Sequence, residues 1–77
     1  MPGPRSSFHL AFGGAIRQLR HEREISQEEL ALRAGIQRSY LGGIERGERN
    51  PSLANIVKIA TTLNVPPSEI LRRAESP

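Results

Sequence analysis

Three polar side chains, Gln37, Arg38 and Ser39, lie together at the start of a predicted helix. Arginine can donate two hydrogen bonds to the acceptors of guanine in the major groove, and glutamine can bond adenine through two atoms. Serine can contact a base or a phosphate. Base contacts are made from the N-terminal end of a helix that enters the groove. The sequence therefore predicts base contacts by these residues, with Arg38 first and Gln37 second.

Residues around the same helix predict contacts with the phosphates of DNA. Arg46, Arg49 and Asn50 follow the helix in a turn, and clustered guanidinium groups suit phosphate oxygens. Gln27 begins the preceding predicted helix, where exposed backbone N–H groups favour an anion, although a solvated first-turn residue is the alternative. Tyr40 can pack its ring while its hydroxyl reaches a phosphate. Contacts of this kind position a protein on DNA rather than read its sequence.

The segment that begins at Ser26 supplies the two helices that would position these side chains. Ser26 is a helix N-cap, and Glu29 completes a capping box three residues later. Gly35 ends the first helix, predicted over 27–34, because glycine takes a left-handed backbone without a Cβ penalty. The second helix is predicted over 37–46. Two short helices joined by a glycine-containing turn are typical of the helix-turn-helix, whose DNA-binding form places the second helix in the major groove.

Three further helices are predicted around this pair, because apolar residues recur at helical spacing and no segment alternates as a strand would. We expect them over residues 9–23, 53–63 and 67–74. The sequence then divides into a flexible N-terminal arm at 1–8, a domain at 9–74 and a frayed tail at 75–77. The predicted fold class is all-α, a compact set of five helices with the helix-turn-helix at its centre.

Two glycine pairs depart from ordinary helix composition. Gly13 and Gly14 weaken the first helix by ~1 kcal/mol each relative to alanine, and they either allow close packing or mark a later helix start. Gly42 and Gly43 remove side chains from the helix that would read DNA. Without side chains the backbone can approach DNA closely. Gly43 therefore joins the predicted base contacts, and DNA shape is expected to supply part of the specificity.

Length and composition indicate one small domain without disulfides. The chain has 77 residues, a formal net charge of +3 and no cysteine. His9 and His21 are too far apart for a metal site on one helix, so no metal and no cofactor are expected. No residue set has the spacing of a catalytic site, which predicts that the protein is not an enzyme. No apolar run is long enough to cross a membrane, so a soluble, cytoplasmic protein is expected.

Beyond these patterns, the chain resembles a known family. The runs SQEELALRAGI, YLGGIERGERNPSL and IVKIATTLNV, in this order, resemble the Cro/repressor-type (XRE-like) helix-turn-helix transcription regulators. The phrases RSY and IERGERN are also similar to the small controller proteins of restriction-modification systems. The resemblance implies a lambda-repressor-like fold in which residues 37–39 face the bases and the side chain of Gln27 bonds a phosphate. It also implies an ion pair between Arg20 and Glu45 that orients the first and third helices.

The predicted function is a transcription regulator, such as a repressor, that binds operator half-sites in double-stranded DNA as a homodimer. Apolar residues of the last two predicted helices are candidates for the dimer contact, although sequence cannot separate them from monomer core: Leu53, Ile56, Val65 and Ile70. No small-molecule effector is expected. The alternative is a protein-interaction adaptor, or an antitoxin-like module, on the same fold. That alternative predicts the loss of polar and basic residues from the third helix, and Arg38, Arg46 and Arg49 argue against it.

Overall fold

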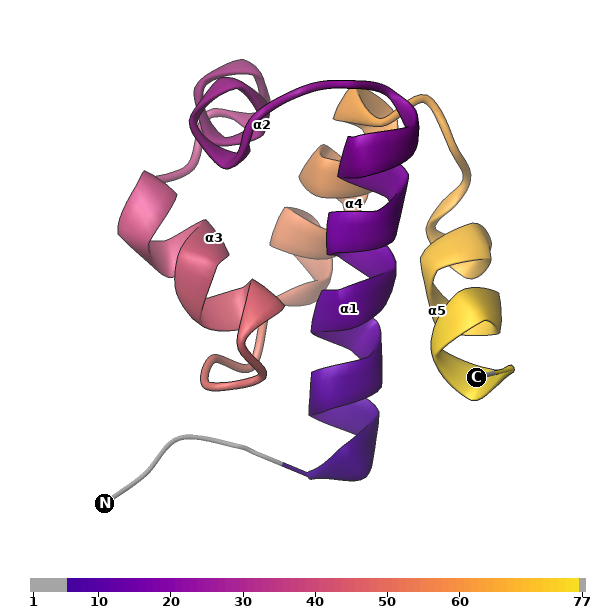
Figure 1. The fold of residues 1–77 in the computed structure, drawn as a ribbon. Helices are drawn as coiled ribbons and strands as arrows, with labels where there is room; N and C mark the ends of the chain where they lie inside the picture. The colour runs from indigo at the N-terminus through magenta and orange to yellow at the C-terminus, as the bar shows by residue number, and fades with distance from the viewer. Residues whose placement is uncertain (1–5, 77) are drawn as a thin grey trace.

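The computed structural model describes residues 6–76, which form five α-helices and, within that range, no strand. The helices are α1 (Ser7–Glu22), α2 (Gln27–Ala34), α3 (Arg38–Glu45), α4 (Leu53–Thr62) and α5 (Pro67–Glu75). Figure 1 shows α1 in the middle of the molecule, with α2 and α3 on one side and α5 on the other. The all-α prediction is confirmed.

The first helix begins earlier than the sequence predicts. The side-chain oxygen of Ser6 accepts a hydrogen bond from the backbone N–H of His9 at 3.2 Å, and this N-cap starts α1 at Ser7. Residues 7 and 8, which we expected in the flexible arm, are therefore helical. Ser6, also expected in the arm, is the N-cap of α1, while residues 1–5 and Pro77 lie outside the described residues. Glu75, expected to fray, is the last residue of α5.

Local signals define the central helix pair as predicted. The Ser26 oxygen accepts a hydrogen bond from the backbone N–H of Glu29 at 3.0 Å, and α2 covers the predicted residues. Gly35 closes α2 with a φ of 72°, in the left-handed region. Helix α3 is one residue shorter at each end than predicted, because Gln37 and Arg46 are its caps. Gln37 makes no side-chain capping bond, so its amide is left for other partners.

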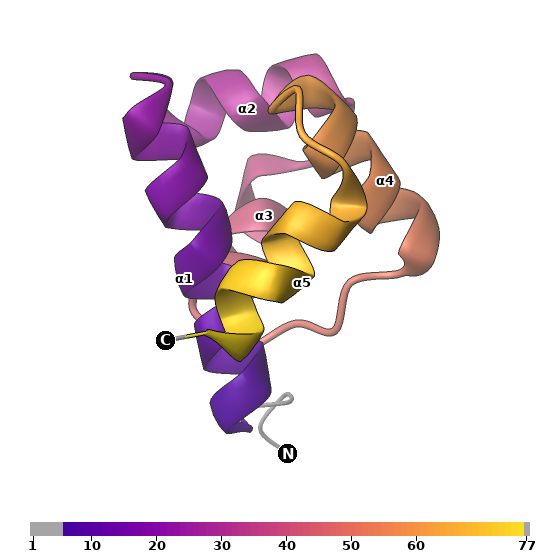
Figure 2. The ribbon, with the colours of Figure 1, turned by 90° about the vertical axis from the view of Figure 1, so that its right-hand side faces the viewer.

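The core lies where all five helices meet. Helix α1 packs against α3 and α5, and α4 packs against α2 and α5. Figure 2 shows α5 crossing in front of α1, with α4 beside it. The largest fully buried side chains come from every helix and from the C-cap of α4: Ile16, Leu19, Leu30, Leu41, Ile44, Ile59, Leu63 and Ile70. Ile70 was a candidate for a dimer contact, and this is wrong, because its side chain is 0% exposed within one chain.

A close approach between α1 and α3 explains one of the two N-terminal glycines. A Cβ atom on Gly13 would overlap the backbone carbonyl oxygens of Ile44 and Glu45. The end of α3 therefore rests directly on the backbone of α1, and the prediction of close packing is confirmed at Gly13. A Cβ atom on Gly14 would meet nothing within 4 Å.

These two neighbouring glycines allow a matched test of the α1–α3 contact. Gly13→Ala is expected to lower the free energy of unfolding by about 1–2 kcal/mol, because overpacking against a backbone outweighs the gain in helix propensity. Gly14→Ala is expected to raise it by up to about 1 kcal/mol, since only the propensity gain applies. Urea denaturation of the two variants measures both effects. Equal stability of the variants would show that α1 and α3 are not in tight contact.

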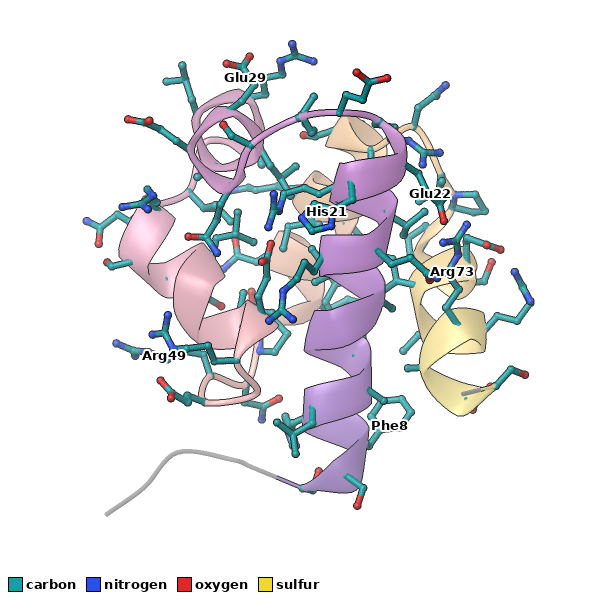
Figure 3. All side chains as sticks on the ribbon, viewed as in Figure 1. Phe8, His21, Glu22, Glu29, Arg49 and Arg73 are labelled. Carbon is teal, nitrogen blue, oxygen red and sulfur yellow. The ribbon has the colours of Figure 1, made fainter. Side chains whose placement is uncertain are left out.

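An exposed ion cluster fixes α5 on α1. Arg73 donates hydrogen bonds to Glu22 at 2.7 Å, to Gln18 at 3.0 Å and to Glu69 at 2.8 Å. Figure 3 shows Glu22 and Arg73 reaching toward each other from the two helices. Hydrogen bonds from Arg72 and then Arg73 lower the pKa of the Glu69 carboxyl from its ordinary value of 4.5 to about 2. Exposed pairs of this kind stabilise a fold only slightly, so the cluster chiefly orients α5.

Candidate nucleic-acid interface

The polar start of α3 is presented to solvent. Gln37, Arg38 and Ser39 are exposed, whereas Leu41 and Ile44 on the opposite side of the helix are fully buried in the core. The core contact therefore fixes which face of α3 points outward. Within residues 6–76, the guanidinium of Arg38 has no hydrogen-bond or ion-pair partner. Its five donors remain available to an external acceptor.

A shallow polar hollow opens beside this turn, between α3 and α4. Ser39 and Tyr40 line it from α3, and Asn55 and Lys58 line it from α4. The hydroxyl of Tyr40 accepts a hydrogen bond from the side-chain amide of Asn55 at 3.1 Å, while the ring packs against the core. The sequence did not single out Asn55 and Lys58, because they occupy what reads as an ordinary solvated side of α4. Only the fold brings them next to α3.

The predicted phosphate contacts after α3 do not all share this hollow. Arg49 lines it together with Ser39. Arg46 is exposed, and its Nε donates a hydrogen bond to Glu48 at 3.1 Å. Asn50 is also exposed but lies at a different, mainly apolar hollow, which it shares with Phe8.

Gln27 points into the domain. Its side-chain amide donates a hydrogen bond to Oε1 of Glu45 at 3.1 Å, and the residue is half-buried. Its oxygen lies 3.3 Å from the position that a Cβ on Gly42 would take. The start of α2 is thereby tied to the end of α3, which fixes the angle of the helix-turn-helix. Gln27 is thus engaged inside the protein in a way that the sequence did not predict.

The ion pair expected between Arg20 and Glu45 is present and buried. Nε and Nη2 of Arg20 donate to the two carboxylate oxygens at 2.8 and 3.0 Å, and the Glu45 side chain is 2% exposed. The remaining Nη1 donates to the carbonyl oxygen of Ile25 at 3.1 Å. Arg17 donates to the carbonyl oxygen of Glu45 at 3.2 Å. Because Glu45 also bonds Gln27, this single carboxylate joins α1, α2 and α3.

We expected the two glycines of α3 to expose bare backbone, but the structure shows that they do not. Gly42 and Gly43 are both buried. A Cβ on Gly42 would lie 3.1 Å from Nη1 of Arg46, and a Cβ on Gly43 would lie 2.5 Å from Cγ of Arg49. Arginine side chains thus cover both positions. Gly43 is therefore out of reach of a base in this conformation, and its place among the predicted base contacts is corrected.

Two short helices joined at a left-handed glycine, with the polar turn of the second one facing solvent, make this domain a helix-turn-helix. The family model described as helix-turn-helix matches residues 16–70. The chain belongs to this family of transcription regulators.

Individual relatives agree with this assignment. The chain is 43% identical over 67 residues to the control protein C.BamHI of Bacillus amyloliquefaciens, a match that covers 86% of this chain and 83% of that one. The crystal structure of the restriction-modification controller protein C.AhdI from Aeromonas hydrophila has a TM-score of 0.79 at 50% identity, and the match covers 80% of this chain and 94% of that one. The biofilm regulator SinR, solved in complex with DNA, has a TM-score of 0.75 at 39% identity, over 78% of this chain and 97% of that one. The resemblance to XRE-like regulators and to controller proteins is confirmed.

Two other properties follow from residues 6–76. None of the helices there is both long and apolar enough to span a membrane. Acidic and histidine side chains in the same range do not gather into a group that could hold a metal ion.

Proposed function

We propose that this protein is a sequence-specific regulator that inserts the first turn of α3 into the major groove of double-stranded DNA. The observation that carries the proposal is the Arg38 guanidinium, which is exposed and has no hydrogen-bond or ion-pair partner among residues 6–76. It lies at the start of a helix whose opposite face is buried in the core. A side chain held in this way can present its fork to guanine without first leaving an internal partner. The relative SinR, solved with DNA, supports this use of the fold.

The surrounding residues divide into reading and positioning roles. Arg38 reads a guanine, Gln37 reads an adenine, and Ser39 contacts a base or a phosphate. Around the hollow beside α3, Tyr40 and Lys58 contact phosphates and set the depth of the helix in the groove. Arg46 and Asn50, which follow the C-terminal end of α3, contact phosphates of the DNA backbone outside this hollow. The regulator works in the cytoplasm, where bacterial DNA lies, and needs no catalytic step.

We also propose that the regulator is a homodimer that binds two half-sites. Five large apolar side chains are exposed on α1, α4 and α5: Phe8 at 44%, Leu10 at 50%, Leu53 at 74%, Val57 at 44% and Leu71 at 39%. Phe8 and Leu71 also line one apolar hollow with the half-buried Ile56. A small domain gains stability by covering such surface with a second copy. Two-fold related copies would then meet half-sites about one helical turn apart.

A matched pair of leucines tests the dimer. Leu53 and Leu32 are both 74% exposed, but Leu53 lies on α4 and Leu32 lies on α2. Leu53→Glu is expected to convert a dimer into a monomer at micromolar concentration, because it places a charge in the apolar contact. Leu32→Glu is expected to leave the mass unchanged. Sedimentation equilibrium measures both, and a wild-type mass equal to one chain would contradict the dimer.

Selection of random DNA duplexes with the purified protein tests the function. The expected result is an enriched sequence made of two related half-sites in inverted orientation, with a guanine in each half-site that Arg38 can bond. The enriched duplex should bind at least about a thousandfold more tightly than unrelated DNA at the same salt concentration. Enrichment of no sequence would contradict the proposal.

A further inference from the structure

Tyr40 bridges the space between α3 and α4. Its ring packs against the core, while the residue also lines the polar hollow between the two helices. Asn55 of α4 donates a hydrogen bond from Nδ2 to the Tyr40 hydroxyl at 3.1 Å, and this contact is partly buried. Within residues 6–76, no other hydrogen bond or ion pair joins a side chain of α3 to one of α4. Asn55 therefore holds the Tyr40 hydroxyl at the hollow.

The N-cap of α4 fixes where Asn55 lies. The backbone N–H of Asn55, in the first turn of α4, donates a hydrogen bond to the side-chain oxygen of Ser52 at 3.1 Å. In a capping box, the side chain at this position reaches back to the N-cap residue. Here the side-chain amide bonds Tyr40 instead. Because asparagine is a weaker helix former than alanine, helix stability does not explain its place in α4.

The direction of this hydrogen bond decides what the hydroxyl can do next. A phenol has one proton to donate, and its oxygen can also accept hydrogen bonds. Since the amide of Asn55 supplies the proton of their shared bond, the proton of the Tyr40 hydroxyl is not used in it. Among the described residues, that hydroxyl donates to no other group. An accepted hydrogen bond also polarises the O–H group and strengthens it as a donor.

We infer that Asn55 is a positioning residue, which holds the Tyr40 hydroxyl ready to donate a hydrogen bond to a DNA phosphate. The inference rests on the proposed function, in which Tyr40 contacts a phosphate, and it adds a residue of α4 that acts without touching DNA. Lys58 and Arg49 line the same hollow, so a phosphate there meets two positive charges as well as the hydroxyl. A hydroxyl that is already held in place loses little freedom when DNA binds. Asn55 thus raises the affinity for DNA through Tyr40.

A double-mutant cycle between Asn55→Ala and Tyr40→Phe tests this role. The probes are the duplex enriched by the wild-type protein and an unrelated duplex of equal length, and urea denaturation checks that each variant is folded. Tyr40→Phe is expected to weaken binding to both duplexes roughly threefold to tenfold, because one hydrogen bond to a phosphate is lost. Asn55→Ala should weaken binding to both roughly twofold to fivefold. In the Tyr40→Phe background, Asn55→Ala should have no further effect.

Asn55→Asp supplies a second variant of nearly the same size. A carboxylate can only accept a hydrogen bond, so it takes the hydroxyl proton that Asn55 leaves for the phosphate. Its negative charge repels DNA with or without that hydroxyl, and the Tyr40→Phe background measures this repulsion alone. We expect Asn55→Asp to lose more affinity in the wild-type background than in the Tyr40→Phe background. Equal losses would contradict the direction of the hydrogen bond and overturn the inference.

Lys58→Ala shows how a direct phosphate contact would behave in the same cycle. Lys58 follows Asn55 by one turn on α4 and lines the same hollow. Its removal should weaken binding by the same factor with and without the Tyr40 hydroxyl. The same behaviour of Asn55→Ala, or no effect of Asn55→Ala on the wild-type protein, would overturn the inference alone. If Tyr40→Phe binds as the wild type does, the phosphate contact of Tyr40 falls with the inference. A wild-type protein that enriches no sequence would overturn the proposed function as well.

Discussion

Arg20→Ala is expected to lower the melting temperature of this domain by about 12 °C or more. The substitution leaves the Glu45 carboxylate, which is 2% exposed, without the guanidinium that bonds both of its oxygens. Breaking a buried pair by removing one partner costs roughly 3–5 kcal/mol. In a domain of this size, each kcal/mol corresponds to about 4–8 °C. The effect is large because the same carboxylate joins three helices.

The exposed pair between Glu29 and Arg33 provides the control for this measurement. It is also one arginine bonded to one glutamate, but on the surface of α2. Arg33→Ala should therefore change stability by less than about 1 kcal/mol. The double variant Arg20→Ala with Glu45→Ala should be more stable than Arg20→Ala alone, since no charge is left buried. Thermal unfolding measures these effects. Equal melting temperatures of Arg20→Ala and Arg33→Ala would mean that the buried pair does not hold the helices together.

Arg38→Ala is expected to lose about tenfold to hundredfold in affinity for the selected duplex, equivalent to ~1–3 kcal/mol. The loss comes from the hydrogen bonds between its guanidinium and one guanine, so the preference for that base pair should relax. Binding to unrelated DNA should change far less. Fluorescence anisotropy with the selected duplex and with single-base-pair variants measures both quantities.

Lys58→Ala is the matched control for Arg38→Ala. Both residues are exposed, and neither has an internal side-chain partner within residues 6–76. Because Lys58 is placed to contact a phosphate, its removal should weaken binding to all sequences alike and reduce the salt slope by about one. Identical base preferences in wild-type and Arg38→Ala proteins would show that Arg38 reads no base.

The parts of the fold that could be predicted depend on neighbours in the sequence. The capping box of Ser26 with Glu29 and the left-handed Gly35 are local, so α2 and its turn came out as predicted. Helix α1 begins two residues before its predicted start because Ser6 is its N-cap. Two adjacent serines could both serve as a cap, so the sequence alone does not show which one begins the helix. The pair of Arg20 with Glu45 spans 25 residues and came from family resemblance alone.

The parts of the site that could not be predicted depend on contacts between elements. Gln27 reads as a residue of an exposed first turn, yet its amide is drawn inward by Glu45. The sequence predicts bare backbone at Gly43, but the loop after Gly47 turns back toward α3 and places the Arg49 side chain over this glycine. No periodicity or propensity encodes such contacts, because each one depends on how two helices and a loop pack together.

The most direct test of the account replaces, one at a time, the guanines of the selected duplex by 7-deazaguanine. This change removes only the N7 acceptor, which lies in the major groove, and keeps base pairing intact. We predict that one replacement in each half-site weakens the wild-type protein but has no further effect on Arg38→Ala. Wild-type binding that tolerates every replacement would contradict the entry of α3 into the major groove.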